Sequence, residues 1–164
     1  MRGVFVDANE ALAVIFERLG KPGDPKVSIN RNPDITSDQY PKLLDGAEIV
    51  VVDHTALPTE IAKQCKGLKH VVFLGTGARS YMNPEELAEL GIEVHLIKGY
   101  GDTAVAECAI ALMWEGARGL AKMDRGIRAG NWRRGDAMQL TGKPLGLIGF
   151  RGIGSGGGRH PPGS

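Results

Sequence analysis

Short hydrophobic runs of strand length alternate with helical patterns over the first part of the chain. Runs rich in β-branched and aromatic residues, which favour strands, occur at residues 4–6, 27–29, 49–52, 71–74 and 94–97. Between them, apolar residues at helical spacing predict helices at residues 8–19, 37–44, 58–65 and 84–90. The run at residues 49–52 is wholly apolar, which is typical of a parallel strand covered by helices on both faces.

Five strand–helix repeats at this spacing predict an α/β fold for residues 1–98, a flavodoxin-like, doubly wound parallel sheet with right-handed crossovers. In such sheets, ligands bind beyond the carboxyl ends of the strands, near a topological switch point. We therefore expect functional residues at 53–55, 75–77 and 98–103. Two interpretations of His54 stay open, namely a ligand contact and a solvent-exposed loop histidine. His70 and His95 are interpreted as structural.

The pattern changes after residue 98. Residues 103–122 predict one long helix that is apolar around most of its circumference, with its polar residues on one narrow stripe. Such a helix needs cover from a second domain or a partner subunit. Residues 123–143 are rich in arginine and predict a solvated or subunit-contacting arm, and residues 145–149 predict a further strand that leads into a glycine turn.

The glycines at residues 149–154 approach the Gly-x-Gly-x-x-Gly pattern of a dinucleotide site. Gly149 and Gly154 occupy the first and third glycine positions, but Arg151 stands at the second, where a side chain would collide with a pyrophosphate. A simple turn that ends a strand is the alternative interpretation. Residues 155–164 consist only of Gly, Ser, Arg, His and Pro, which predicts a coil tail rather than the helix that a dinucleotide site needs.

Composition and charge exclude several classes of protein. The chain has 164 residues, with 20 lysines and arginines against 19 aspartates and glutamates. A hydrophobic fraction of 42% argues against disorder, and the lack of a basic excess argues against a nucleic-acid binder. No run approaches the ~20 apolar residues of a membrane helix. Glycine is overrepresented, at 24 residues, of which six lie in the last 14.

The two cysteines point to a reducing compartment. Cys65 and Cys108 lie inside apolar helical patterns and are predicted to be buried, reduced thiols. No metal-ligand spacing surrounds them, so the sequence predicts no metal site. We expect a cytoplasmic protein.

Four stretches, in order, carry a resemblance to a known family. They are Phe-Leu-Gly-Thr-Gly at residues 73–77, Thr-Ala-Val-Ala-Glu at 103–107, Arg-Ala-Gly-Asn-Trp at 128–132, and Gly-Lys-Pro-Leu-Gly-Leu-Ile-Gly at 142–149 with Gly152, Ile153 and Gly154. Over residues 1–154 the chain resembles the D-isomer-specific 2-hydroxyacid dehydrogenase family, which includes phosphoglycerate and glyoxylate/hydroxypyruvate reductases.

The resemblance implies an NAD(P)-dependent oxidoreductase that interconverts small 2-hydroxy acids and 2-oxo acids. Residues 1–98 would be the substrate domain, and 99–154 the interdomain helix, the arm and the truncated start of a Rossmann domain. The implied substrate-binding residues are Gly75, Thr76 and Gly77. The implied cofactor-binding residues are Thr76, Val105, Gly149, Gly152, Ile153 and Gly154. A homodimer, or self-association through residues 103–143, is also implied.

This sequence departs from the family's pattern at two points. An acidic–amide pair usually follows the glycine turn, where Arg79 and Ser80 stand here. The family's catalytic arginine, glutamate and histidine come from segments beyond the glycine motif, and none of the four histidines of this chain matches the catalytic one. The expectation is therefore an inactive form with no catalytic residue, which binds neither NAD nor NADP.

Two questions stay open at this point. The residues of the tail at 155–164 are those that out-of-frame reading of a GC-rich gene tends to yield, so a frameshift near codons 151–156 is one hypothesis for it. A designed or vector-derived tail is the other. For the function, the alternative is a non-catalytic module of flavodoxin-like fold that binds a carboxylate or another subunit.

Overall fold

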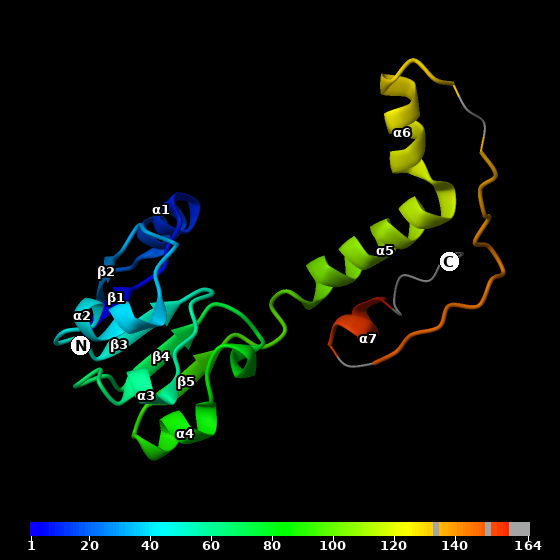
Figure 1. Cartoon of the computed structure of the whole chain (residues 1–164). Helices are drawn as coiled ribbons and strands as arrows, with labels where there is room; N and C mark the ends of the chain where they lie inside the picture. The colour runs from blue at the N-terminus through cyan, green and yellow to red at the C-terminus, as the bar shows by residue number, and fades with distance from the viewer. Residues whose placement is uncertain (133–134, 150–151, 158–164) are drawn as a thin grey trace. The chain divides into compact units, whose positions relative to one another are not determined.

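The computed structural model describes residues 1–132, 135–149 and 152–157 of the chain. It divides into two compact units, Met1–Lys98 and Gly99–Ser164, which are described one at a time (Figure 1). In the described part of the chain, no helix has both the length and the apolar character to cross a membrane.

The first unit is built on a five-stranded parallel sheet, which confirms the predicted α/β, doubly wound fold. The strand order is β2-β1-β3-β4-β5, so the chain adds strands on one side of β1 and then on the other. The strands are β1 (Arg2–Phe5), β2 (Lys26–Ile29), β3 (Ile49–Val52), β4 (His70–Phe73) and β5 (Glu93–Leu96). The switch point between β1 and β3 is where such sheets bind ligands.

Helices connect the strands and begin at recognisable caps. They are α1 (Glu10–Leu19), α2 (Tyr40–Leu43), α3 (Thr59–Ala62) and α4 (Pro84–Glu89), with 3-10 turns η1 (Ser37–Gln39) and η2 (Ala78–Ser80). The side chain of Asn9 accepts a hydrogen bond from the amide of Leu12, and that of Asn83 accepts from Glu85 and Glu86. Together η1 and α2 span nearly all of the predicted helix at residues 37–44, whereas α3 is shorter than the predicted 58–65.

The two faces of the sheet are covered unequally. The main core lies between one face and the helices α2, α3 and α4, and its largest fully buried side chains include Tyr40, Leu44 and Leu87. The opposite face packs against α1, through a smaller cluster around Phe5 and Val51. An apolar groove of about 740 Å³ lies along this face, between α1 and strands β1 to β4.

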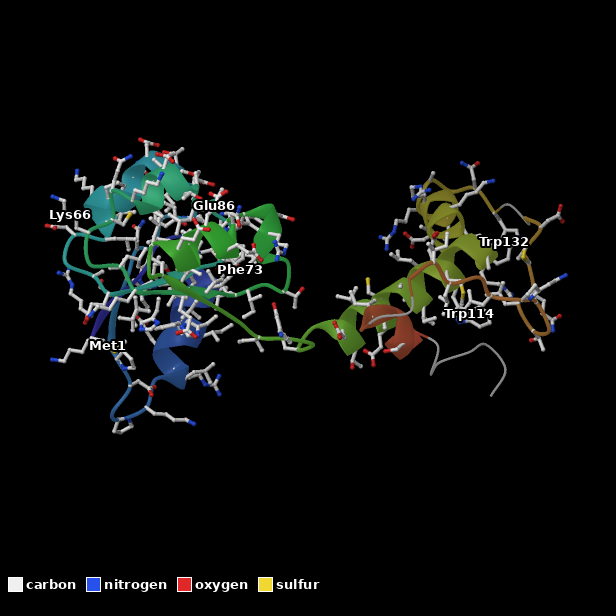
Figure 2. The ribbon with its side chains drawn as sticks, turned by 90° about the horizontal axis from the view of Figure 1, so that it is seen from below. Met1, Lys66, Phe73, Glu86, Trp114 and Trp132 are labelled. Atoms are coloured by element: carbon white, nitrogen blue, oxygen red, sulfur yellow. The ribbon has the colours of Figure 1, made fainter. Side chains whose placement is uncertain are left out.

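The second unit contains α5 (Asp102–Arg118), α6 (Leu120–Arg128) and α7 (Ile153–Gly157). Both tryptophans of the chain, Trp114 and Trp132, belong to it (Figure 2). The prediction of one continuous helix at residues 103–122 is wrong, because Gly119 adopts a left-handed conformation, with φ of 63°, that ends α5. Helix continues to Arg128, into the segment predicted to be an arm.

Three further expectations for the second unit and the cysteines need correction. Residues 145–149 form no strand, because the described part of this unit offers no strand with which they could pair. Residues 155–157, predicted as coil, belong to α7, which packs against α5 despite its glycines. The remainder of the predicted tail, 158–164, lies outside the described residues, as does Arg151. Both cysteines are free, but Cys108 is exposed and only Cys65 is buried.

Candidate functional site

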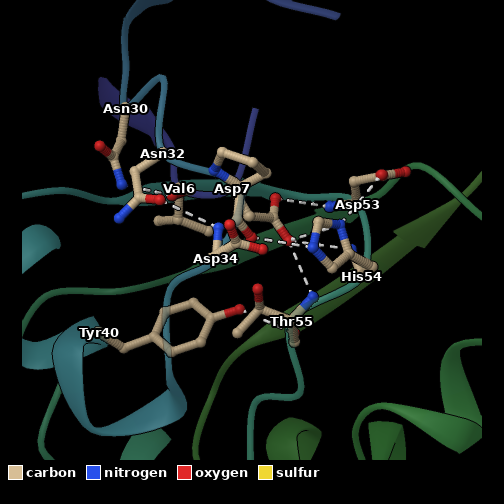
Figure 3. Close-up of polar contacts among 10 residues, drawn as sticks. Val6, Asp7, Asn30, Asn32, Asp34, Tyr40, Asp53, His54 and Thr55 are labelled. Atoms are coloured by element: carbon tan, nitrogen blue, oxygen red, sulfur yellow. Dashed lines mark hydrogen bonds and ion pairs between the residues drawn. The ribbon is translucent and has the colours of Figure 1, made fainter. Parts of the chain in front are cut away.

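The candidate site lies at the carboxyl edge of the sheet in the first unit. Because all five strands are parallel, the residues that follow β1, β3 and β4 meet at this edge. These are Asp7 after β1, residues 53–55 after β3 and residues 75–77 after β4. Figure 3 shows the polar contacts around the first two.

Asp7 organises the loop after β3. Its side chain is fully buried, and its two carboxylate oxygens accept three backbone hydrogen bonds. Oδ1 accepts from the amide of Asp53 at 2.9 Å, and Oδ2 accepts from His54 at 2.9 Å and Thr55 at 2.8 Å. A buried carboxylate needs such donors to offset its lost hydration. The Asp7 side chain therefore ties the end of β1 to the loop after β3 at the switch point.

The sequence analysis did not identify Asp7 as a site residue. One signal was available, since an acidic side chain follows directly on the apolar run of the first strand, at the strand that borders the switch point. Its partners could not be read from the sequence, because they lie 46 to 48 residues further along the chain.

His54 is held by acceptors on both ring nitrogens. Its Nδ1 lies 3.2 Å from the Asp53 carboxylate and 3.6 Å from that of Asp7, and its Nε2 lies 2.9 Å from the carbonyl oxygen of Pro33. Partial desolvation lowers the pKa of His54, but the hydrogen bond to Asp53 and the charge of Asp7 outweigh it, so the pKa is raised. These contacts favour a loop-positioning role for His54 over free acid–base chemistry.

The buried side chain of Tyr40 also contacts the loop at residues 53–55. Its hydroxyl donates to the carbonyl oxygen of Thr55 at 2.9 Å within the core. Burial, helped by the charge of Asp7, raises the pKa of the phenol far above its ordinary value, so Tyr40 stays a neutral donor. The side-chain oxygen of Thr55 is buried and has no hydrogen-bond partner among the described residues.

The glycine turn after β4 contains the three residues predicted to bind substrate. Thr76 and Gly77 are exposed, and Gly75 is half-buried. A Cβ atom on Gly75 would lie 2.5 Å from the ring of Phe73, which is itself buried against Tyr81 at 5.1 Å between ring centroids. A Cβ atom on Gly77 would meet nothing within 4 Å. Gly75 is therefore fixed by packing, whereas the space at Gly77 is open.

The backbone of this turn offers free donors. Within the part of the chain that the structure describes, the amides of Gly75, Thr76 and Gly77 donate no hydrogen bond to another residue. Successive backbone amides in a turn are one of the arrangements by which proteins bind anions. The nearby guanidinium of Arg79 forms a two-pronged ion pair with the carboxylate of Glu85, which lowers the pKa of that carboxyl. Among the described residues, the amides of this turn thus make no hydrogen bond, whereas the guanidinium of Arg79 is already paired.

The other predicted cofactor-binding residues belong to the second unit, whereas Thr76 belongs to the first. Val105 is half-exposed on α5. Gly149 has a φ of 88°, and a Cβ atom on Gly154 would lie 2.1 Å from the carbonyl oxygen of Gly149, so these two positions accept only glycine.

The same turn does not fit a pyrophosphate. A Cβ atom on Gly152 would lie 2.7 Å from a carboxylate oxygen of Asp102, so a negative charge already stands against the turn. Helix α7, which follows, has five described residues, Ile153–Gly157. A pyrophosphate needs aligned amides and a positive helix terminus, and here it would face a carboxylate.

Comparisons with known proteins agree with the motifs. No family model matches the chain. Hydroxypyruvate reductase of Thermotoga maritima is 31% identical over 123 residues, which are 73% of this chain and 40% of that enzyme. D-3-phosphoglycerate dehydrogenase of Archaeoglobus fulgidus is 33% identical over 108 residues, or 65% of this chain and 20% of that enzyme.

Solved structures share the fold over nearly the whole chain. D-2-hydroxyisocaproate dehydrogenase superposes with a TM-score of 0.78 at 16% identity, over 96% of this chain and 48% of that one. The apo-structure of D-lactate dehydrogenase from Escherichia coli gives a TM-score of 0.77 at 20% identity, over 97% and 52%. The chain thus spans about two fifths of the first relative named above and about half of these structures. On its sequence and its fold, this chain belongs to the D-isomer-specific 2-hydroxyacid dehydrogenase family.

Proposed function

We propose that residues 1–98 form the substrate domain of a 2-hydroxyacid dehydrogenase and bind the carboxylate of a small 2-hydroxy or 2-oxo acid. Gly75, Thr76 and Gly77 are the proposed binding residues. The observation that carries the proposal is the exposed turn after β4, whose three amides donate to no other residue in the described chain. A carboxylate that accepts from these amides makes the charge-assisted hydrogen bonds that they lack.

Binding at this turn alone is expected to be weak. Two or three hydrogen bonds to a small anion are consistent with a Kd on the order of 1 mM, equivalent to about 4 kcal/mol. The buried Asp7 has a supporting role, since it fixes the neighbouring loop at residues 53–55.

We further propose that this chain does not itself transfer hydride. The ring nitrogens of His54 are engaged with Asp53 and Pro33, and the guanidinium of Arg79 is engaged with Glu85. Neither is then free to donate a proton to a substrate carbonyl or to polarise it. The carboxylate of Asp102 against the glycine turn also argues against coenzyme binding, so neither NAD nor NADP is expected to bind.

The second unit is proposed to mediate self-association, most simply as a homodimer. Helices α5 and α6 expose large apolar side chains, among them Leu112 at 64% and Ile127 at 57% of their surface. Several large apolar side chains exposed on these two helices favour an interaction site there. The free thiols of Cys65 and Cys108 fit a reducing compartment such as the cytoplasm.

A titration with hydroxypyruvate tests carboxylate binding. Dihydroxyacetone is the matched control, because it keeps the hydroxyl and the ketone but has no carboxylate. We expect hydroxypyruvate to shift the backbone amide resonances of Gly75, Thr76 and Gly77 in a saturable way and dihydroxyacetone to leave them unmoved. Equal shifts with both compounds, or shifts confined to other residues, would refute the proposal.

A further inference from the structure

A second group of chemically active side chains lies on the sheet, outside the candidate site. His70 begins β4, and Glu93 and His95 lie on the adjacent edge strand β5 (Figure 1). The strand register sets Glu93 opposite His70 and His95 opposite Val72. Residues two apart on a strand point to the same face, so all three side chains share one face of the sheet.

The three side chains bring together one ligand atom each. The Nδ1 of His70 lies 3.1 Å from the Nε2 of His95, and Oε2 of Glu93 lies 3.8 Å and 3.7 Å from these two nitrogens. The point equidistant from these three atoms in their plane is about 2.1 Å from each, which is the usual Zn–N and Zn–O distance. A cation at this point lies within bonding distance of all three atoms, once the imidazole rings turn their nitrogens toward it.

The contact between the histidines is itself suited to metal replacement. At 3.1 Å, one imidazole nitrogen carries the proton and the other presents a lone pair to it. A cation can take the place of this proton and bind both nitrogens. The donating imidazole, which stays neutral, then carries its hydrogen on its other ring nitrogen. The exposed fractions of 29% for His70, 68% for Glu93 and 43% for His95 leave the position open to solvent.

We propose that His70, Glu93 and His95 form a binding site for a divalent cation of the zinc class. Two imidazoles and one carboxylate suit Zn²⁺, Ni²⁺ or Cu²⁺, whereas Mg²⁺ and Ca²⁺ prefer oxygen ligands alone. Water completes the coordination. The bound ion ties the edge strand β5 to β4. The sequence analysis predicted no metal site, because the ligands lie 23 and 25 residues apart and only the strand register joins them.

Isothermal titration of the full chain with Zn²⁺ tests the site. The variants are H70Q, H95Q and E93Q, and E89Q is the matched control for the loss of a nearby exposed carboxylate. All are made with C108S, because the exposed thiol of Cys108 is a competing ligand. Loss of one ligand is expected to weaken Zn²⁺ binding by about 10-fold to 100-fold or more, since even outer-shell changes have effects of that size. E89Q is expected to bind as the parent does.

Histidine side-chain NMR of the parent gives a readout that does not depend on the folding of any variant. On addition of Zn²⁺, we expect the Nδ1 of His70 and the Nε2 of His95 to show the ¹⁵N shifts of metal-bound nitrogens. The chelator EDTA should reverse them. Unchanged affinity in both H70Q and H95Q, or metal-bound shifts at His54 or His160 in place of these two, would overturn the proposal.

Discussion

The carboxylate of Asp7 accepts a 2.8 Å hydrogen bond from the backbone amide of Thr55, a residue 48 positions further along the chain. This contact joins the end of β1 to the end of β3 across the switch point of the sheet. It is one of three that the same buried carboxylate makes, so Asp7 makes three of the hydrogen bonds that hold the loop at residues 53–55.

Asp7→Asn is therefore expected to destabilise the first unit by about 2–3 kcal/mol, because the amide group replaces one acceptor with a donor and leaves buried amides unsatisfied. Asp38→Asn, at an exposed position, is the control and should change stability by less than about 0.5 kcal/mol. The free energy of unfolding is measured by urea titration followed on amide resonances of residues 1–98, since both tryptophans report on the second unit. Equal stability of the two variants would contradict the role given to Asp7.

The raised pKa of His54 predicts a definite pH dependence. Its charged form is favoured in the folded state, so its contribution to stability is fully present below the unfolded pKa of about 6.5 and is lost as pH rises through the folded pKa. An NMR titration of the His54 ring should give a midpoint above 6.5. The free energy of unfolding of the parent should fall as pH rises from about 6.5 through the folded pKa of His54, and this fall should be absent in His54→Gln. A midpoint below 6.5 would show that desolvation prevails over the carboxylates.

Gly75 and Gly77 provide a matched pair of substitutions. A Cβ atom at Gly75 requires the buried ring of Phe73 to move, so Gly75→Ala should destabilise the first unit by about 1–3 kcal/mol. Gly77→Ala places its Cβ atom in open space and should be nearly neutral. The same urea titration compares them. A neutral Gly75→Ala would show that the turn after β4 is not fixed by Phe73.

Self-association through the second unit has a concentration-dependent signature. Sedimentation equilibrium should show a mass above that of the 17.5 kDa monomer, and Leu112→Lys should shift the distribution to monomer by placing a charge on the exposed apolar surface. Glu107→Lys, on the same helix, is the control for a change of charge alone. A monodisperse parent monomer at all concentrations would rule out the proposed interface.

Coenzyme binding is expected to be absent or very weak. The carboxylate of Asp102 at the Gly152 turn opposes a pyrophosphate. Titration with NADH, followed by its fluorescence, should show no saturation. A Kd in the micromolar range would contradict this account of the glycine turn.

The sequence predicted the elements whose signals are local. The strands were recognisable from apolar runs such as residues 49–52, and the glycine turn at residues 75–77 from its motif. The contacts of Asp7 and the meeting of His70 with His95 depend on strand order and register, which a single sequence does not display. Gly119 lies inside an otherwise helical pattern, so the break there was missed. The glycines of α7 have a low helix propensity, but α7 packs on α5, and this packing overrides the local signal.

The most direct measurement for the central claim is the hydroxypyruvate titration repeated on Gly77→Pro and Gly77→Ala. Proline removes one of the three proposed donors, whereas alanine keeps it, and far-UV spectra and amide resonances of the core verify that both variants fold. We predict that Gly77→Pro loses at least about 10-fold in affinity, equivalent to 1.4 kcal/mol, and that Gly77→Ala binds as the parent does. Equal affinity of the folded proline and alanine variants would contradict carboxylate binding by the amides of this turn.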